Sequence, residues 1–234
     1  MRKVFLAFVI AGLMAVCAAP ASAVVLYDNG GPDYYTGFYS DTQNSAINEG
    51  GALYIAYNQF TLFSAATITG MEWWGLYYPG NSPPGSGDVF DYDVQSNPGS
   101  AGQPSGEITS GVLGGLSVTD TGNVLAGCEV YQYNASASIA LSAGTYYLSI
   151  YDTVSNPGNT FTWCTSTETA TGTSEWSYDT SSNDYGWLGT SEYGLAFNLT
   201  GESSGAFVPE PATMTLLGLG LAGLGAKVAR RRSR

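Results

Sequence analysis

Aspartate and glutamate are the only charged side chains between residues 24 and 207, a segment without a single Lys, Arg or His. Without these three residue types, the segment cannot build a Ser-His-Asp triad, a Cys-His pair, a Schiff base, a histidine metal site or an ordinary phosphate clamp. It contains no P-loop and no dinucleotide-binding glycine fingerprint. The chemistry that remains is that of carboxylates, which act in pairs as acid and base or bind hard cations.

Two glutamates beside tryptophans are the first candidates for such chemistry. Glu72 precedes Trp73 and Trp74, and Glu175 precedes Trp176. A pair of carboxylates can hydrolyse a glycosidic bond, one as the acid and the other as the nucleophile or base. The same residues also fit strands whose glutamates face solvent and whose tryptophans lie in the core. A carbohydrate-active enzyme that uses this glutamate pair is therefore an alternative hypothesis.

Three aspartates form a second candidate site. Asp88, Asp91 and Asp93 lie within six residues, and Asp91 and Asp93 are expected on the same side of a strand. Calcium favours several clustered oxygen ligands, although the spacing is not that of an EF-hand loop. A solvated acidic edge that discourages strand pairing fits the same residues. No organic cofactor is expected, and calcium is the one ion that the sequence suggests.

Aromatic residues are the third feature, because the chain has 17 Tyr and 5 Trp but few charges. Trp176, Tyr178, Tyr185 and Trp187 crowd a polar segment rich in Gly, Ser and Thr, so we expect exposed rings there. An aromatic face with a polar tip suits carbohydrate and protein surfaces. These four residues are candidate ligand-binding residues, and the alternative is that tyrosine fills the strands of an ordinary secreted sandwich.

The elements that must position these residues are strands. Alternating or β-rich segments cover residues 53–57, 66–78, 146–151 and 195–200. Trp73 and Trp74 are expected on opposite faces of their strand. Turns rich in Asn, Pro and Gly separate the segments, and no stretch shows a sustained helical stripe. We predict an all-β protein in which residues 24–202 form a single, jelly-roll-like β-sandwich of roughly nine to eleven strands.

One segment of this sandwich is rich in Pro, Gly and Ser, from residue 81 to residue 106. It surrounds a short strand that is expected over residues 88–95. Such a composition favours a flap or an edge strand at this place.

The first 23 residues have the three parts of a secretory signal peptide. Two basic residues precede an apolar run over residues 4–16, and Ala21 and Ala23 form an A-x-A site that predicts cleavage before Val24. The apolar run is shorter than the roughly 20 residues that a spanning helix needs, and a retained membrane anchor is the alternative. We expect an N-terminal signal helix that signal peptidase removes.

Two cysteines, Cys128 and Cys164, remain in the chain after that cleavage. An even number of cysteines in an exported chain favours a disulfide. Each cysteine lies on or near an expected strand, so the bridge would tie two strands together. The alternative is two unpaired buried thiols.

The end of the chain has another three-part order. Pro209, Glu210 and Pro211 come first, an apolar stretch follows over residues 212–226, and Arg230, Arg231 and Arg232 belong to a terminal basic cluster. Because proline disfavours a helix interior, the helix is expected to begin at Pro211 or later. Counted through residue 229, it can just span a membrane, with its arginines on the cytoplasmic side. Residues 203–208 would be a spacer.

This order, over residues 209–234, resembles the PEP-CTERM sorting signal of Gram-negative bacteria. The resemblance implies an inner-membrane exosortase that cuts near the Pro-Glu-Pro and passes the protein to the cell surface or to extracellular polysaccharide. Residues 141–150 and 195–201 also resemble strands of secreted bacterial sandwiches, which supports the fold alone. The alternative is an ordinary C-terminal anchor. Because proteins of many kinds carry the signal, it does not reveal what the domain does.

The leading hypothesis is a non-enzymatic, structural or adhesive β-sandwich that is exported to the cell surface or extracellular matrix and contacts polysaccharide. Its C-terminal helix would hold it in the inner membrane only until processing. Residues 24–207 carry 18 acidic and no basic side chains, a charge that repels nucleic acid. The expected partners are signal peptidase, exosortase and extracellular polysaccharide. A carbohydrate-active enzyme and a calcium-dependent carbohydrate-binding module are the alternatives.

Overall fold

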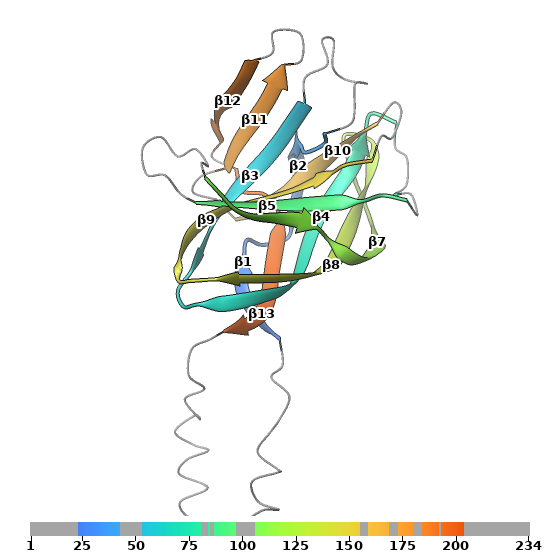
Figure 1. The fold of residues 1–234 in the computed structure, drawn as a ribbon. Coiled ribbons are helices and arrows are strands. Elements are labelled where there is room, and N and C mark those ends of the chain that lie inside the picture. The colour runs from blue at the N-terminus through green and yellow to red at the C-terminus, as the bar shows by residue number, and fades with distance from the viewer. Residues whose placement is uncertain are drawn as a thin grey trace, which may run out of the picture. The chain divides into compact units, whose positions relative to one another are not determined.

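The computed structural model describes residues 23–42, 53–80, 84, 87–96, 106–154, 159–168, 173–179, 184–191 and 193–203, and only the backbone at 53, 173–179 and 184–191. All of them belong to one unit, residues 1–204. Figure 1 shows their strands. The strands are β1 Val24–Asp28, β2 Pro32–Tyr39, β3 Leu53–Leu62, β4 Ala66–Tyr78, β5 Phe90–Ser96, β6 Glu107–Val112, β7 Gly114–Leu125, β8 Cys128–Leu141, β9 Gly144–Asp152, β10 Thr160–Ser166, β11 Thr173–Asp179, β12 Asp184–Ser191 and β13 Phe197–Ser203.

The described part of the chain contains only strands, turns and bends, which confirms the all-β prediction. No helix that could cross a membrane occurs in it. The expected signal helix before Ala23 and the expected C-terminal membrane helix lie outside the described residues. So do Ala21, most of the spacer, and the sorting residues Pro209, Glu210, Pro211, Arg230, Arg231 and Arg232.

Strand β4 is the centre of a seven-stranded antiparallel sheet, because its 13 residues pair with three other strands. Strand β8 pairs along one edge of β4, from Ala66 to Gly75. The other edge is shared, since β13 pairs with residues 66–73 and β10 with residues 75–78. Strand β1 then extends the sheet beyond β13, β2 extends it beyond β10, and β7 extends it beyond β8.

The second sheet has six antiparallel strands in the order β12-β11-β3-β9-β5-β6. The expectation of a flap or edge strand over residues 88–95 is wrong, because β5 pairs with β9 on one side and β6 on the other. Residues 107–112 supply the missing neighbour, β6, and they were not expected to form a strand.

The main core lies between the two sheets. The inward side chains of β3, β5 and β9 pack against those of β4, β8 and β10. Phe90 is central, because its ring lies 5.3 Å from Trp73, 5.2 Å from Tyr133 and 4.8 Å from Phe161, centroid to centroid. Tilted and edge-to-face contacts of this kind contribute about 0.5–1.5 kcal/mol per pair beyond area burial. Two packed antiparallel sheets confirm a sandwich-like fold, and the jelly-roll order stays a prediction.

A second, smaller apolar cluster lies on the outer face of the seven-stranded sheet. It contains Trp74, Leu76, Leu125, Cys128, Val130, Cys164 and Ala196, with Tyr34 and Tyr78 packed against it. Trp73 and Trp74 therefore face opposite sides of β4, as predicted. Strands β2 and β7 end the path β7-β8-β4-β10-β2, yet they contact each other, since Asn123 Nδ2 donates to Tyr34 Oη at 3.0 Å. The sheet thus curls over its outer cluster.

Candidate functional site

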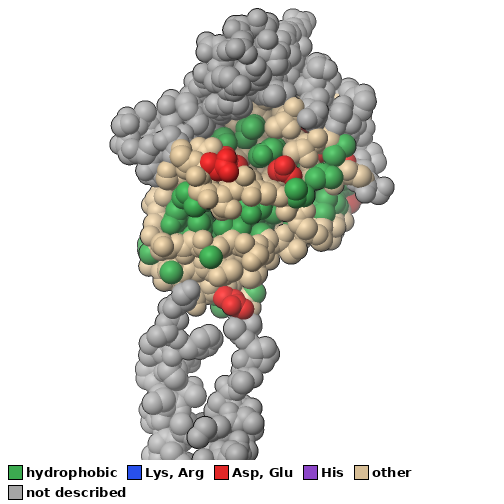
Figure 2. Space-filling model, viewed as in Figure 1, with side chains coloured by type: hydrophobic (Ala, Val, Ile, Leu, Met, Phe, Trp, Pro, Cys, Tyr) green, Lys and Arg blue, Asp and Glu red, His purple; other side chains and the backbone are tan. Residues whose placement is uncertain are grey.

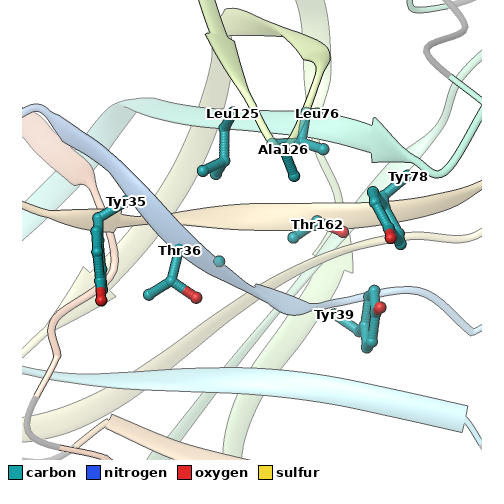
Figure 3. Close-up of a pocket in the computed structure, with 9 residues that line it drawn as sticks. Tyr35, Thr36, Tyr39, Leu76, Tyr78, Leu125, Ala126 and Thr162 are labelled. Atoms are coloured by element: carbon teal, nitrogen blue, oxygen red, sulfur yellow. The ribbon is translucent and has the colours of Figure 1, made fainter.

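A shallow groove opens beside this outer cluster, between β2 and the turn that joins β7 to β8 (Figure 3). Its volume is about 190 Å³. It is lined by Tyr35, Thr36, Gly37 and Tyr39 of β2, Leu76 and Tyr78 of β4, Leu125 and Ala126 at the turn, and Thr162 of β10. None of these residues is charged. We call this feature the tyrosine groove.

The tyrosines give the groove both apolar faces and hydroxyl groups. Tyr35 is 75% exposed, whereas Tyr39 and Tyr78 are half-buried. The ring of Tyr39 is supported from behind by Tyr54, with 5.9 Å between their centroids. Thr162 adds a hydroxyl from the neighbouring strand. Aromatic faces combined with neutral hydrogen-bonding groups are the chemistry that suits a neutral sugar.

The backbone of β2 is shaped to present Tyr35. Tyr34 has a left-handed φ of 56°, which is uncommon outside glycine. Its ring packs on the outer cluster, while the next side chain, Tyr35, points to solvent. Asp33 Oδ1 holds the bend because it accepts the backbone N–H of Tyr35 at 2.9 Å and the hydroxyl of Thr165 at 2.7 Å. The backbone that carries the exposed ring is therefore held by the contacts of Asp33 and Tyr34.

A two-residue turn forms the opposite wall. Leu125 pairs with Cys128, and the two residues between them, Ala126 and Gly127, have φ of 52° and 83°. A hairpin turn with both angles positive favours Asn-Gly or Gly-Gly, so alanine at its first position is strained. Ala126 nevertheless places no more than a methyl group at the groove.

A second hollow of about 250 Å³ lies further along the outer face of the same sheet, and Glu72 and Asn134 are among the residues that line it. Glu72 Oε1 accepts a hydrogen bond from Gln132 Nε2 at 2.7 Å. The other candidate glutamate, Glu175, lies in β11 of the six-stranded sheet, where it pairs with Ala56. Glu72 and Glu175 therefore lie in different sheets, and the carbohydrate-active enzyme that would use them stays an alternative hypothesis.

The three aspartates expected as calcium ligands are separated. Asp91 and Asp93 alternate with the core residues of β5 and share its outer face, as predicted. Asp88 does not join them, because Tyr77 reaches it from the core side and donates to its Oδ2 at 2.9 Å. The grouping of all three is wrong, since Asp88 lies an odd number of residues before Asp91 and Asp93 and so falls on the core side with Phe90.

Asp88 belongs instead to a buried acidic cluster at one end of the core. Asp152 Oδ2 also lies 2.7 Å from Tyr77 Oη, whose single proton is donated to one of the two carboxyl groups at a time, and Asp41 bridges to Asp152 through the backbone. Burial raises the pKa of Asp152 to about 6, and the charges of Asp41 and Asp88 add to this effect, while hydrogen bonds from Val154 and Tyr77 oppose it. The sequence carried no signal for this cluster, because its members are dozens of residues apart.

The four aromatic residues expected to bind ligand lie on one hairpin. Trp176 pairs with Trp187, and Tyr178 pairs with Tyr185, across β11 and β12. Because residues two apart in a strand share a face, these positions fall on one face of the hairpin. Their side chains lie outside the described part of the structure, so their role in binding stays a prediction.

The expected disulfide between Cys128 and Cys164 is not formed, and both are buried free thiols. Gly75 pairs with Tyr131 of β8 on one side and with Trp163 of β10 on the other, which puts these two residues level. Cys128 lies three residues before Tyr131, and Cys164 lies one residue after Trp163. The two cysteines are therefore offset by about 13 Å along the strand direction. A disulfide needs Cα atoms within about 7 Å. The sequence placed both cysteines on strands but could not supply this offset.

Among the coloured residues of the view in Figure 2, acidic side chains are the only charged groups. Figure 2 shows red carboxylates among green and tan surface, with no blue or purple side chain among the coloured residues. This follows from the sequence, since residues 24–207 contain no basic residue. Any positive charge that meets this surface must come from outside residues 24–207.

Comparison with known proteins locates one family. Residues 207–232 match the model of the PEP-CTERM protein-sorting motif. No curated protein and no solved structure matches the chain. The motif implies export, a C-terminus anchored in the membrane before processing, and processing by an exosortase. The chain therefore carries the PEP-CTERM protein-sorting motif at residues 207–232, as an exosortase substrate does.

Proposed function

We propose that this protein is a non-enzymatic component of the cell surface or extracellular matrix, and that its sandwich binds neutral polysaccharide through the tyrosine groove. The observation that carries the proposal is the groove itself, in which Tyr35, Tyr39 and Tyr78 lie beside threonine hydroxyls and the lining contains no charged residue. The sorting motif supports it by directing the chain to where extracellular polysaccharide is found.

Charge selects the kind of polysaccharide. The segment from residue 24 to residue 207 has 18 acidic side chains and no basic one, so an anionic polymer is repelled. The groove can recognise a neutral sugar by ring stacking and hydroxyl hydrogen bonds, which need no charge. Binding to a neutral polysaccharide should therefore depend little on salt, because exposed charges are what salt screens.

The size of the groove sets the strength of each contact. Its volume of about 190 Å³ is below the roughly 300–1,000 Å³ of drug-sized sites, so it accommodates only a short stretch of polymer. Single contacts of this kind are weak, and many copies displayed on one surface reach useful strength through avidity. This mode of action suits an adhesive or matrix protein and requires no catalysis.

The test measures binding of the full chain, in mild detergent, to neutral polysaccharides such as glucan and mannan and to the anionic polymer alginate, by affinity electrophoresis and calorimetry. Tyr35→Ala and Tyr78→Ala are expected to weaken neutral-glycan binding at least tenfold. Phe63→Ala is the matched control, because Phe63 is an aromatic that is 94% exposed on the turn between β3 and β4. Binding that survives both tyrosine changes, or that prefers alginate, would refute the proposal.

A further inference from the structure

A row of oxygen atoms on the outer face of the six-stranded sheet has no use in the proposed function. Asp93 of β5 pairs with Ser149 of β9 on one side and with Ser110 of β6 on the other. Asp91 lies two residues along the same strand and so shares the face of Asp93. Side chains directly opposite each other in such a pair have Cβ atoms only about 4.5–5.5 Å apart.

Three atoms in this row lack hydrogen-bond partners. Asp91 Oδ1, Asp93 Oδ1 and Ser149 Oγ are all buried and accept or donate no hydrogen bond. Ser149 is fully buried and Asp93 is 8% exposed. Buried polar groups are nearly always satisfied, so three such atoms on neighbouring positions of one face require a common explanation.

The carboxylate of Asp93 is held so that its unpartnered oxygen stays available. Tyr57 Oη donates to Asp93 Oδ2 at 2.8 Å, and Gln95 Nε2 donates to the same oxygen at 2.6 Å. Both contacts fix one oxygen and leave Oδ1 free to bind another group. Asp91 is only half-buried, which leaves a route from solvent to the row.

The β-sandwich itself has no cation to place there. Residues 24–207 contain no Lys, Arg or His, and a buried carboxylate stays ionised only beside a paired charge or a metal ion. We propose that Asp91 Oδ1, Asp93 Oδ1 and Ser149 Oγ bind a calcium ion, with water completing its coordination. Calcium accepts six to eight oxygen ligands in flexible geometry, whereas magnesium demands a near-ideal octahedron and keeps its water.

The number of charged ligands also determines the expected affinity for calcium. Among the described residues, no group of three Asp, Glu, His or Cys side chains could hold a metal, so the site has two carboxylates and one hydroxyl. Few charged ligands give weak sites, and the dissociation constant belongs with extracellular calcium modules, at about 10⁻⁴–10⁻³ M. This site lies on the other sheet from the tyrosine groove and does not depend on the proposed function.

The test uses the full chain, stripped with EDTA, and measures calcium binding by calorimetry and thermal unfolding. Calcium at tenfold its dissociation constant should raise Tm by about 3–6 °C. Asp93→Asn and Ser149→Ala should each lose most of this rise, with at least tenfold weaker binding for Asp93→Asn. Glu202→Gln, an exposed acid at the end of β13, is the control and should keep the full rise.

Ser149→Ala separates a metal site from a purely structural role. It removes a buried hydroxyl that has no partner, so without calcium the variant should unfold at the same temperature as the native chain or higher. Ser149→Ala therefore remains informative even if Asp93→Asn does not fold. A native chain that shows no rise with calcium, a rise that persists in both variants, or an equal rise with sodium chloride at matched ionic strength would overturn the proposal.

Discussion

Raising the pH from 5 to 7.5 is expected to destabilise the folded domain, because the buried carboxyl of Asp152 must then lose its proton. Its pKa is about 6 in the folded protein and 3.8 in the unfolded chain. Between these values the folded state holds a proton that the unfolded state has released. Stability from this group is therefore complete below pH 3.8 and is lost as the pH rises through 6.

The magnitude follows from the shift of about two pKa units, each of which is worth about 1.4 kcal/mol, so the whole effect is about 3 kcal/mol. About half of it, roughly 1.4 kcal/mol, is lost between pH 5 and pH 7.5. For a domain of this size that loss lowers Tm by about 3–5 °C. Most proteins are near their maximum stability over the same range, because their paired carboxylates are already ionised there.

The assay is urea or thermal unfolding at fixed ionic strength, with EDTA present so that bound metal does not contribute. Asp152→Asn is the matched variant, because it removes the titrating proton while its amide can still bond to Tyr77 and to the backbone of Val154. Between pH 5 and pH 7.5 this variant should lose roughly 1.4 kcal/mol less of its free energy of unfolding than the native chain loses. A native chain whose stability rises from pH 5 to pH 7.5, or a variant with an unchanged slope, would refute the reasoning.

Three further predictions concern the turn, the thiols and the processed ends. Replacing Ala126 by Gly should stabilise the domain by about 0.5–1 kcal/mol, because glycine adopts its left-handed φ without strain. Ala126→Asn should also fit the turn but should weaken glycan binding. Equal urea midpoints for the native chain and both variants would contradict the strain at Ala126. Cys128 and Cys164 should react with a thiol reagent only after denaturation, because both are buried and burial raises the pKa of the Cys164 thiol; fewer than two thiols in denaturant would show a bond. The native protein recovered from the cell surface should have a mass that begins at Val24 and ends near Pro209, and a mass that retains the terminal arginines would contradict exosortase processing.

The sequence predicted what local alternation controls. Trp73 and Trp74 were placed on opposite faces of β4, and Asp91 and Asp93 on one face of β5, because neighbouring residues in a strand point to opposite sides. Asp88 was grouped with the other two because it is close to them in sequence, but its odd spacing from both puts it on the core side, where it contacts Tyr77.

Features that depend on pairing between distant strands could not be predicted from the sequence. The offset between Cys128 and Cys164 is set by the way β8 and β10 both pair with β4, which no cysteine spacing reveals. The tyrosine groove joins β2 to the turn after β7, nearly 90 residues later in the chain, and an Ala-Gly turn lacks the usual Asn-Gly signal. The strand β6 was missed because Ser110 and Gly111 interrupt its β-forming residues Ile108, Thr109 and Val112.

The pairing of β1 with β13 has a consequence for the order of events during export. Val24 pairs with Gly201, so the first strand after the expected cleavage site and the last strand before the sorting motif lie side by side. A chain that emerges N-terminus first delivers β1 and β4 more than a hundred residues before β13, which must fit between them. The seven-stranded sheet cannot close until almost the whole chain has crossed, and by then the sorting motif is reaching the membrane. The domain therefore completes its fold at the time when the sorting motif reaches the membrane.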